Sequence, residues 1–122
     1  MHPLAVLPVF VDLAGRRVVV AGAGDAAAWK AELAAAAGAH VEVFAPDPCA
    51  ELDALSQAPP AGGVAIVARH WCANDLAGAA LAIGALAGED AVAFAAAARA
   101  HGVPVNIVDT PALSTFLSLI HI

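Results

Sequence analysis

The sequence predicts a three-layer α/β domain built on a doubly wound parallel sheet. Short runs rich in valine and isoleucine alternate with alanine-rich stretches, and glycines and prolines separate the two kinds of segment. Runs that are apolar throughout are typical of strands buried on both faces, as in parallel sheets covered by helices. Because such alternation favours right-handed crossovers, we expect the strand order 3-2-1-4-5 of Rossmann-like nucleotide-binding folds.

Glycines delimit the first predicted strand and the first predicted helix. Residues 17–21 form a β-branched run that follows the turn-like Ala14-Gly15 and ends at a glycine. Residues 25–37 are nearly all strong helix formers, and Gly38 follows where a C-cap glycine is expected. This part of the chain therefore predicts one strand, one tight turn and one helix.

The middle of the chain repeats the pattern. We expect a second strand over residues 41–45, closed by Pro46-Asp47-Pro48, and a short helix over residues 50–57 that ends before Pro59-Pro60. A third strand is expected over residues 64–68. Clusters of proline and glycine set these boundaries.

The last third of the chain supplies the remaining elements. We expect a one-turn connection at residues 74–76, a fourth strand over 80–84, a helix over 90–100 and a fifth strand over 103–108. Pro104 lies early in the fifth strand, where it removes a hydrogen-bond donor from the ladder. Strands and helices thus alternate to the end of the predicted domain.

Length and charge exclude several classes of function. The 122 residues fit one domain, and a formal net charge of −6 leaves five permanent cations, which are Lys30, Arg16, Arg17, Arg69 and Arg99. These form no basic stripe, so we expect no nucleic-acid partner. No uninterrupted apolar run reaches the roughly 18 residues of a membrane span. The apolar start of the chain has no basic leader and no cleavage-type segment, so we expect a cytoplasmic protein.

Cysteines and histidines give no sign of a metal centre. Cys49 and Cys72 lie far apart, fit no CxxC spacing and are expected to be ordinary reduced thiols. The five histidines are scattered without ligand spacing. No metal site is therefore predicted.

A glycine motif stands between the first strand and the first helix. Gly22-Ala23-Gly24-Asp25-Ala26-Ala27 matches the G-x-G-x-x-G/A pattern of dinucleotide-binding domains. In that pattern Gly22 permits the tight turn, Gly24 lets the main chain approach a pyrophosphate, and Ala27 keeps helix and strand close. The helix N-terminus adds free N–H groups and a positive dipole. The alternative is a glycine turn that merely joins the two elements.

The expected acid at the end of the second strand is missing. Residues 44–46 are Phe-Ala-Pro, and the first acidic residue is Asp47. An acid at this point usually binds the adenosine ribose. Pro46 and Asp47 are therefore candidates for the adenosine side of a cofactor site, or alternatively part of a simple Pro-Asp-Pro turn.

An aspartate follows the fifth strand directly. Asp109 is expected at the carboxyl edge of the sheet, where open α/β folds bind their ligands. A carboxylate there can act as general acid or base, or hold a metal ion beside the substrate. The alternative is an Asp-Thr-Pro turn or a helix N-cap.

Three further blocks of sequence carry a resemblance to a known family, and the first and last of them are far more specific than the glycine motif. They are residues 7–13, LPVFVDL; residues 38–46, which begin Gly-Ala-His-Val and end Ala-Pro; and residues 103–116, VPVNIVDTPALSTF. Together with the glycine turn and Lys30 they extend over nearly the whole chain. On these residues the chain resembles the family of precorrin-2 dehydrogenases and sirohydrochlorin ferrochelatases, which includes the N-terminal module of siroheme synthase.

The resemblance implies an NAD-dependent oxidoreductase of siroheme biosynthesis that converts precorrin-2 to sirohydrochlorin. For the full-length protein it also implies a homodimer and a ferrochelatase (lyase) step that inserts ferrous iron. Asp109 would be the catalytic aspartate, and Asp25, Ala26, Pro46 and Asp47 would contact the cofactor, largely through backbone groups. The absence of an arginine after the second strand favours NAD over NADP.

The chain departs from the family pattern at three places. Trp29 replaces the arginine usually found before Lys30, and the loop 85–89 is shorter by one residue and lacks the usual Thr-Asp-Asp type sequence. After Phe116 the family continues into an Asp-Arg segment and a helical dimerisation region, whereas this chain ends in LSLIHI, which resembles translated adapter sequence. We therefore predict an NAD-binding domain over residues 1–116 and a non-family tail over 117–122, the mark of a truncated chain.

Two other interpretations stay open. A non-catalytic NAD-binding regulatory module would place an acid at the end of the second strand and would need no aspartate at position 109. An inactive fragment would lack a complete substrate cleft and would fail to unfold cooperatively.

Overall fold

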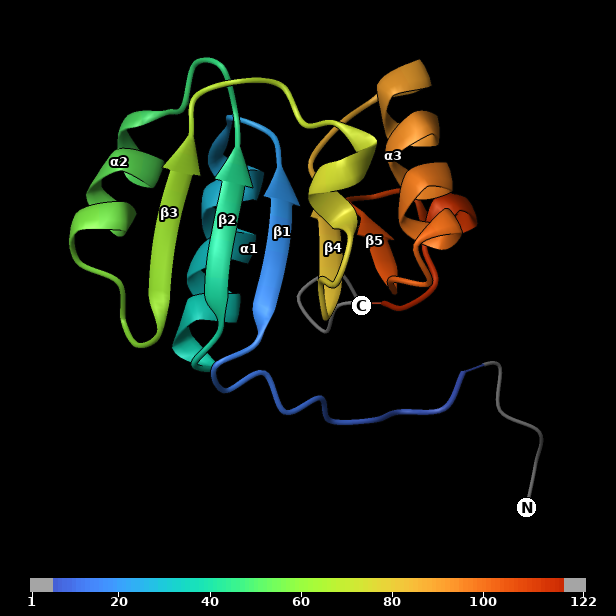
Figure 1. The fold of residues 1–122 in the computed structure, drawn as a ribbon, viewed down its shortest axis with the longest axis horizontal. Helices are drawn as coiled ribbons and strands as arrows, with labels where there is room; N and C mark the ends of the chain where they lie inside the picture. The colour runs from blue at the N-terminus through green and yellow to red at the C-terminus, as the bar shows by residue number, and fades with distance from the viewer. Residues whose placement is uncertain (1–5, 118–122) are drawn as a thin grey trace.

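The strands form one parallel sheet in the order β3-β2-β1-β4-β5, which confirms the predicted topology. The computed structural model describes residues 6–117, and Figure 1 shows the sheet with its helices. Except for Leu117, the predicted tail over 117–122 lies outside the described residues. The strands are β1 Arg17–Ala21, β2 His40–Phe44, β3 Gly63–Val67, β4 Leu81–Gly84 and β5 Val105–Ile107. The helices are α1 Asp25–Ala36, α2 Ala50–Gln57 and α3 Gly88–Ala100, with 3-10 turns η1 Ala73–Leu76 and η2 Pro111–Leu113.

The helices cover both faces of the sheet, as the doubly wound prediction requires. One core lies between α1, α2 and the sheet residues Val18, Val20 and Ile83, and the other lies between α3, η1 and the alternate residues Val19 and Ala82. In Figure 1 α1 lies behind β1 and β2, whereas α3 lies beside β4 and β5 on the other face. The side of α1 that faces the sheet is mostly alanine, and these small side chains let the helix lie close to the strands.

The fifth strand is shorter than predicted. It spans Val105–Ile107 rather than residues 103–108. The N–H of Val103 donates to the carbonyl of Ala98 and so closes the end of α3, and Pro104 has no N–H to donate. The sheet ladder therefore starts two residues later than the apolar pattern indicates.

The outer edge of β5 is covered by hydroxyl side chains of the segment that follows η2. The N–H of Val105 donates to Thr115 Oγ1 at 2.8 Å, and the N–H of Ile107 donates to Ser114 Oγ at 2.9 Å. The N–H of Thr115 returns a hydrogen bond of 2.7 Å to the carbonyl of Val105. The segment thus satisfies edge groups that would otherwise lack partners, which explains the Ser-Thr pair near the end of the third sequence block.

We expect Thr115→Val to lower the free energy of unfolding by about 1–2 kcal/mol, because the substitution leaves the N–H of Val105 without an acceptor. Chemical denaturation of the two proteins measures the difference. Ser56→Ala is the matched control, since Ser56 Oγ donates to an exposed carbonyl on α2 and its loss should cost no more than roughly 0.5 kcal/mol. Equal effects of the two substitutions would contradict the role of the hydroxyl in covering β5.

No helix within residues 6–117 is long and apolar enough to cross a membrane. The longest, α3, has 13 residues, whereas a span needs about 20.

Candidate functional site

Gly22 makes the tight turn that leaves β1. Its φ is +134°, and a Cβ at this position would lie 2.8 Å from the carbonyl oxygen of Ala85 and 2.9 Å from its Cβ. Its N–H donates to the carbonyl of Phe44 at 3.1 Å, which joins the turn to the end of β2. Only glycine fits both the backbone conformation and the space.

Gly24 leaves the start of α1 open. It is the N-cap residue, and a Cβ built on it meets no described atom within 4 Å. No side chain of residues 6–117 caps this helix end, so its first N–H groups and the helix dipole are available to an anion. Asp25 and Ala26, which follow, are exposed, whereas Ala27 is fully buried against the sheet. This arrangement fits a dinucleotide pyrophosphate bound on backbone groups.

The loop after β2 lies against the glycine turn. The N–H of Cys49 donates to the carbonyl of Ala23 at 3.0 Å. Pro46 and Asp47, predicted on the adenosine side, are exposed in this loop. The structure therefore brings together the turn and the loop that were singled out separately in the sequence.

Asp109 lies at the carboxyl edge of the sheet, immediately beyond β5. It is exposed and adopts φ +60°, a left-handed conformation that aspartate tolerates better than most residues. The N–H of Val108 donates to the carbonyl of Gly84 and the N–H of Thr110 to the carbonyl of Ile107, both at 3.0 Å, so the turn is fixed to β4 and β5. The N-cap of η2 is Thr110 and not Asp109, which argues against the alternative that Asp109 caps a helix.

The glycine turn and Asp109 flank the point where the strand order reverses. From β1 the chain continues on one side to β2 and β3, and on the other side to β4 and β5. The N–H of Ala85 donates to the carbonyl of Ala21 at 2.8 Å, which holds the ends of β4 and β1 together. The carboxyl ends at such a switch point form the ligand crevice of open α/β sheets.

Beside this site lies a lysine whose burial the sequence does not reveal. Lys30 on α1 is 2% exposed, and its Nζ makes no hydrogen bond with any described residue. Burial lowers the pKa of the Lys30 ammonium, and the negative charge of Asp109 acts in the opposite direction. A mostly apolar helix with alanine on every side gives no periodicity that would show which residues face the sheet.

Three possible metal ligands also meet near the starts of α1 and α2. A carboxylate oxygen of Asp25, the Sγ of Cys49 and a carboxylate oxygen of Glu51 all lie within 4.8 Å of one another. Sequence spacing could not find this group because it joins two helices. Asp25 and Glu51 are exposed, and exposed acidic groups often gather without an ion.

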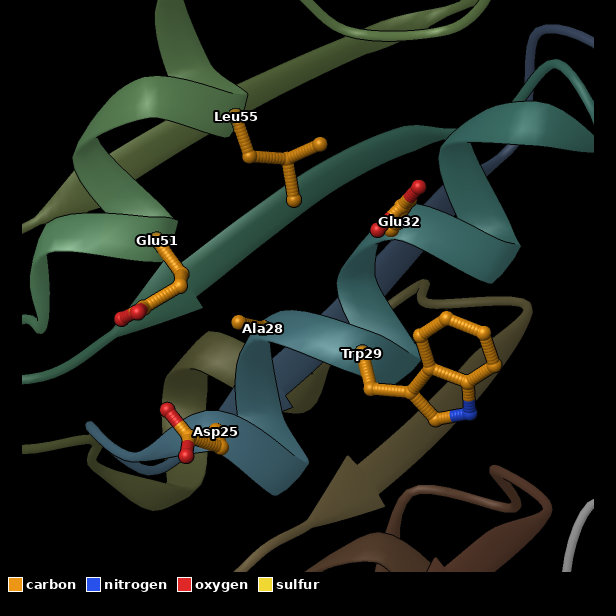
Figure 2. A pocket seen from close by; sticks show the side chains of 6 residues that line it. All are labelled: Asp25, Ala28, Trp29, Glu32, Glu51 and Leu55. Atoms are coloured by element: carbon orange, nitrogen blue, oxygen red, sulfur yellow. The ribbon is translucent and has the colours of Figure 1, made fainter.

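A hollow of about 280 Å³ lies between α1 and α2. Figure 2 shows its lining, with Asp25, Ala28, Trp29 and Glu32 from α1 and Glu51 and Leu55 from α2. Trp29 is half-exposed at this hollow. The hollow shares Asp25 with the predicted site and includes none of the other predicted site residues.

An arginine on the loop after β3 stacks on the last residue of β2. The Arg69 guanidinium carbon lies 5.1 Å from the ring centroid of Phe44. Its two terminal nitrogens donate to the two carboxylate oxygens of Asp75 at 2.9 and 2.8 Å. The guanidinium holds the pKa of Asp75 well below its usual range. The positive charge of Arg69 is therefore already paired with a carboxylate.

Comparisons with known proteins place the chain in a family. Residues 9–118 match a family model described as "Putative NAD(P)-binding". The siroheme synthase of Ectopseudomonas mendocina (strain ymp) is 43% identical over 112 residues, which are 91% of this chain and 23% of that protein. The siroheme synthase of Azotobacter vinelandii (strain DJ / ATCC BAA-1303) is 41% identical over 114 residues, 91% of this chain and 24% of that protein. The chain thus spans about a quarter of the length of these relatives.

A solved structure shares the fold. The chain named "SirC, precorrin-2 dehydrogenase" superposes with a TM-score of 0.71 at 20% identity, over 92% of this chain and 54% of that one. The likeness to siroheme synthases indicated by the sequence is confirmed by the relatives. Because the family model extends over most of its length, this chain belongs to the NAD(P)-binding family that the model describes.

Proposed function

We propose that this chain carries the nicotinamide-dinucleotide part of a precorrin-2 dehydrogenase, which oxidises precorrin-2 to sirohydrochlorin in siroheme biosynthesis. The observation that carries the proposal is the placement of an uncapped, glycine-lined helix start and of Asp109 on opposite sides of the switch point. The siroheme synthases and the precorrin-2 dehydrogenase to which the chain is similar supply the substrate class.

The reaction needs an acceptor for hydride and an acceptor for a proton. Oxidation of precorrin-2 removes two electrons and two protons. Both electrons leave with one proton as hydride, and the second proton leaves separately. A bound NAD would supply the hydride acceptor. Gly22, Gly24, Asp25 and Ala26 would hold its pyrophosphate on backbone groups, and Pro46 and Asp47 would line its adenosine end.

Asp109 is the proposed catalytic residue. Its carboxylate is exposed at the carboxyl edge, and β4 lies between the strand that it follows and the strand that ends at the glycine turn. A macrocycle lying over β4 and β5 would there meet a nicotinamide over the switch point. A carboxylate in that position can take the proton released as the hydride leaves. Because this side chain is exposed, it can pass the proton on to solvent.

Charge near the end of β2 supports NAD rather than NADP. Recognition of a 2′-phosphate uses an arginine near this point. Among residues 6–117 the cation beside the end of β2 is Arg69, and Asp75 already neutralises it through a two-point hydrogen bond. We therefore propose NAD as the cofactor.

The remaining predictions from the resemblance stay part of the proposal. They are ferrous iron as a second substrate in a ferrochelatase step, a homodimer of the full-length protein, and a cytoplasmic location. Iron insertion would take place on the same macrocycle, and the metal would displace two pyrrole protons. Accepting these protons would be a second role for the Asp109 carboxylate.

NAD-dependent conversion of precorrin-2, followed by absorbance, tests the proposal. We would assay the chain alone and the chain joined to the part of the Ectopseudomonas mendocina relative that it does not match, each with NAD or NADP. Conversion that prefers NAD is the expected result. If both forms bind NAD but neither converts precorrin-2, the dehydrogenase proposal is wrong and a non-catalytic dinucleotide-binding module is the better description.

A further inference from the structure

Lys30 is a buried cation without a hydrogen-bond partner among the described residues. It is the single lysine of the sequence, it is 2% exposed, and its Nζ is buried. Burying an ammonium group is costly unless a charge or a set of hydrogen bonds compensates for it. A methionine would fill the same space on α1 without that cost, so a lysine at this position needs a reason beyond packing.

The charged groups around α1 indicate what Lys30 interacts with. The sheet presents apolar side chains to α1, which include Val18 and Val20 of β1 and Ile83 of β4. On α2 the acidic groups Glu51 and Asp53 are exposed. Asp109 is the residue whose charge acts on the Lys30 ammonium and favours its protonated form.

A second polar group without a full set of partners lies on the same face of the sheet. Asn106 is 6% exposed; its Nδ2 donates to the carbonyl of Phe116 at 3.0 Å, but its Oδ1 has no partner among the described residues. Asn106 pairs with Ile83 in the sheet and so faces the α1 side, whereas its neighbours Val105 and Ile107 belong to the α3 side. A buried polar side chain thus lies on the α1 side of β5, three residues before Asp109.

We propose that Lys30 is a positioning residue for Asp109, an inference that rests on the proposed function. Its ammonium group, buried on α1, attracts the Asp109 carboxylate and orients it toward the crevice. Because α1 also begins at the pyrophosphate-binding turn, one helix would fix both the cofactor and the orientation of the base. The energetic cost of burying the ammonium group is then tolerated because it orients the proposed base, and the rest of the fold offsets that cost.

The first test is the titration of Lys30 in the chain itself. Since the chain has one lysine, selective ¹³C labelling gives a single lysine side-chain signal in NMR. We expect the pKa of Lys30 to lie below 10.5 and to fall further in Asp109→Asn, because that substitution removes the charge that favours protonation. Asp53→Asn, on exposed α2, is the matched control and should leave the titration unchanged.

An unchanged Lys30 titration in Asp109→Asn would overturn the inference. This experiment needs no catalytic activity, so its outcome is independent of whether the chain oxidises precorrin-2. A failure of the positioning role is thereby distinguished from a failure of the proposed function.

The second test separates positioning from packing. We expect Lys30→Met to unfold at an equal or higher denaturant concentration, because apolar replacements of buried charges are often neutral or stabilising. The affinity for NAD should stay the same, while turnover of precorrin-2 falls by roughly tenfold, because the Asp109 carboxylate is less well oriented to take the proton. Lys30→Arg, which keeps the charge, should recover part of the turnover. Full turnover in Lys30→Met, or a loss that only follows a loss of folded protein, would contradict the proposal.

Discussion

Replacing Asp109 with asparagine is expected to reduce NAD-dependent oxidation of precorrin-2 by roughly a hundredfold to ten-thousandfold, the usual contribution of a general base. Asparagine is the informative substitution because Asp109 has φ +60°, a conformation that asparagine adopts readily. Alanine at the same position would add backbone strain and mix a stability effect with a catalytic one. Turnover at saturating cofactor measures the change.

Two controls accompany the Asp109 experiment. The affinity for NAD should be nearly the same in Asp109→Asn, since the pyrophosphate-binding turn belongs to β1 and α1, with β4 between β1 and β5. Asp53→Asn, which removes an exposed carboxylate from α2, should keep full turnover. Normal turnover in Asp109→Asn would show that another group takes the proton and would remove the main reason for placing the reaction at this edge.

Replacing Gly22 and Gly24 one at a time is expected to separate folding from cofactor binding. Gly22→Ala forces a Cβ to within 2.8 Å of the Ala85 carbonyl at a φ of +134°, and we expect it to lower the free energy of unfolding by about 2–4 kcal/mol. Gly24→Ala meets open space at an ordinary φ of −95°. It should keep the stability of the parent chain.

The affinity for NAD should respond differently. In Gly24→Ala the added methyl group stands where the pyrophosphate must approach the main chain, so binding should weaken by about tenfold or more while the fold is unchanged. Urea denaturation and calorimetric titration with NAD measure the two quantities. Unchanged affinity in Gly24→Ala would contradict the assignment of the helix start as the phosphate site.

Much of the fold follows from local signals in the sequence. β1 and α2 have the predicted bounds, because glycine or proline stands near their ends. β2 and β3 are each shifted by one residue from the predicted range, since the pairing of neighbouring strands fixes where the ladder begins. β5 is half as long as predicted because the backbone of Val103 closes α3 and hydroxyl groups of the following segment occupy its edge.

The place of a candidate residue in the fold was predictable where the residue stands at a strand end. It was not predictable where it depends on how the helices pack. The glycine turn and Asp109 stand at strand ends, so the parallel topology alone places them at one edge. The burial of Lys30 depends on which side of an alanine-rich helix faces the sheet, and the approach of Cys49 to Asp25 and Glu51 depends on how α1 and α2 pack. Neither is encoded in spacing along the chain.

Part of the first sequence block finds no role within residues 6–117. Leu13 is buried in the core beneath α1, but Phe10 is fully exposed, and Val6, Leu7 and Val9 before it are largely exposed. In Figure 1 this segment runs past the amino ends of the strands, away from the crevice. The described residues therefore explain the end of the block and not its beginning.

Mapping of NAD onto the chain by amide NMR tests the central claim most directly, because the residues proposed to bind the cofactor all lie within the described part of the chain. We expect saturable shifts that cluster at residues 22–27, at the amides next to Pro46 and at residues 108–110, with weaker binding of NADP. Shifts confined to the hollow between α1 and α2, or no shifts from a chain that unfolds cooperatively, would contradict the account.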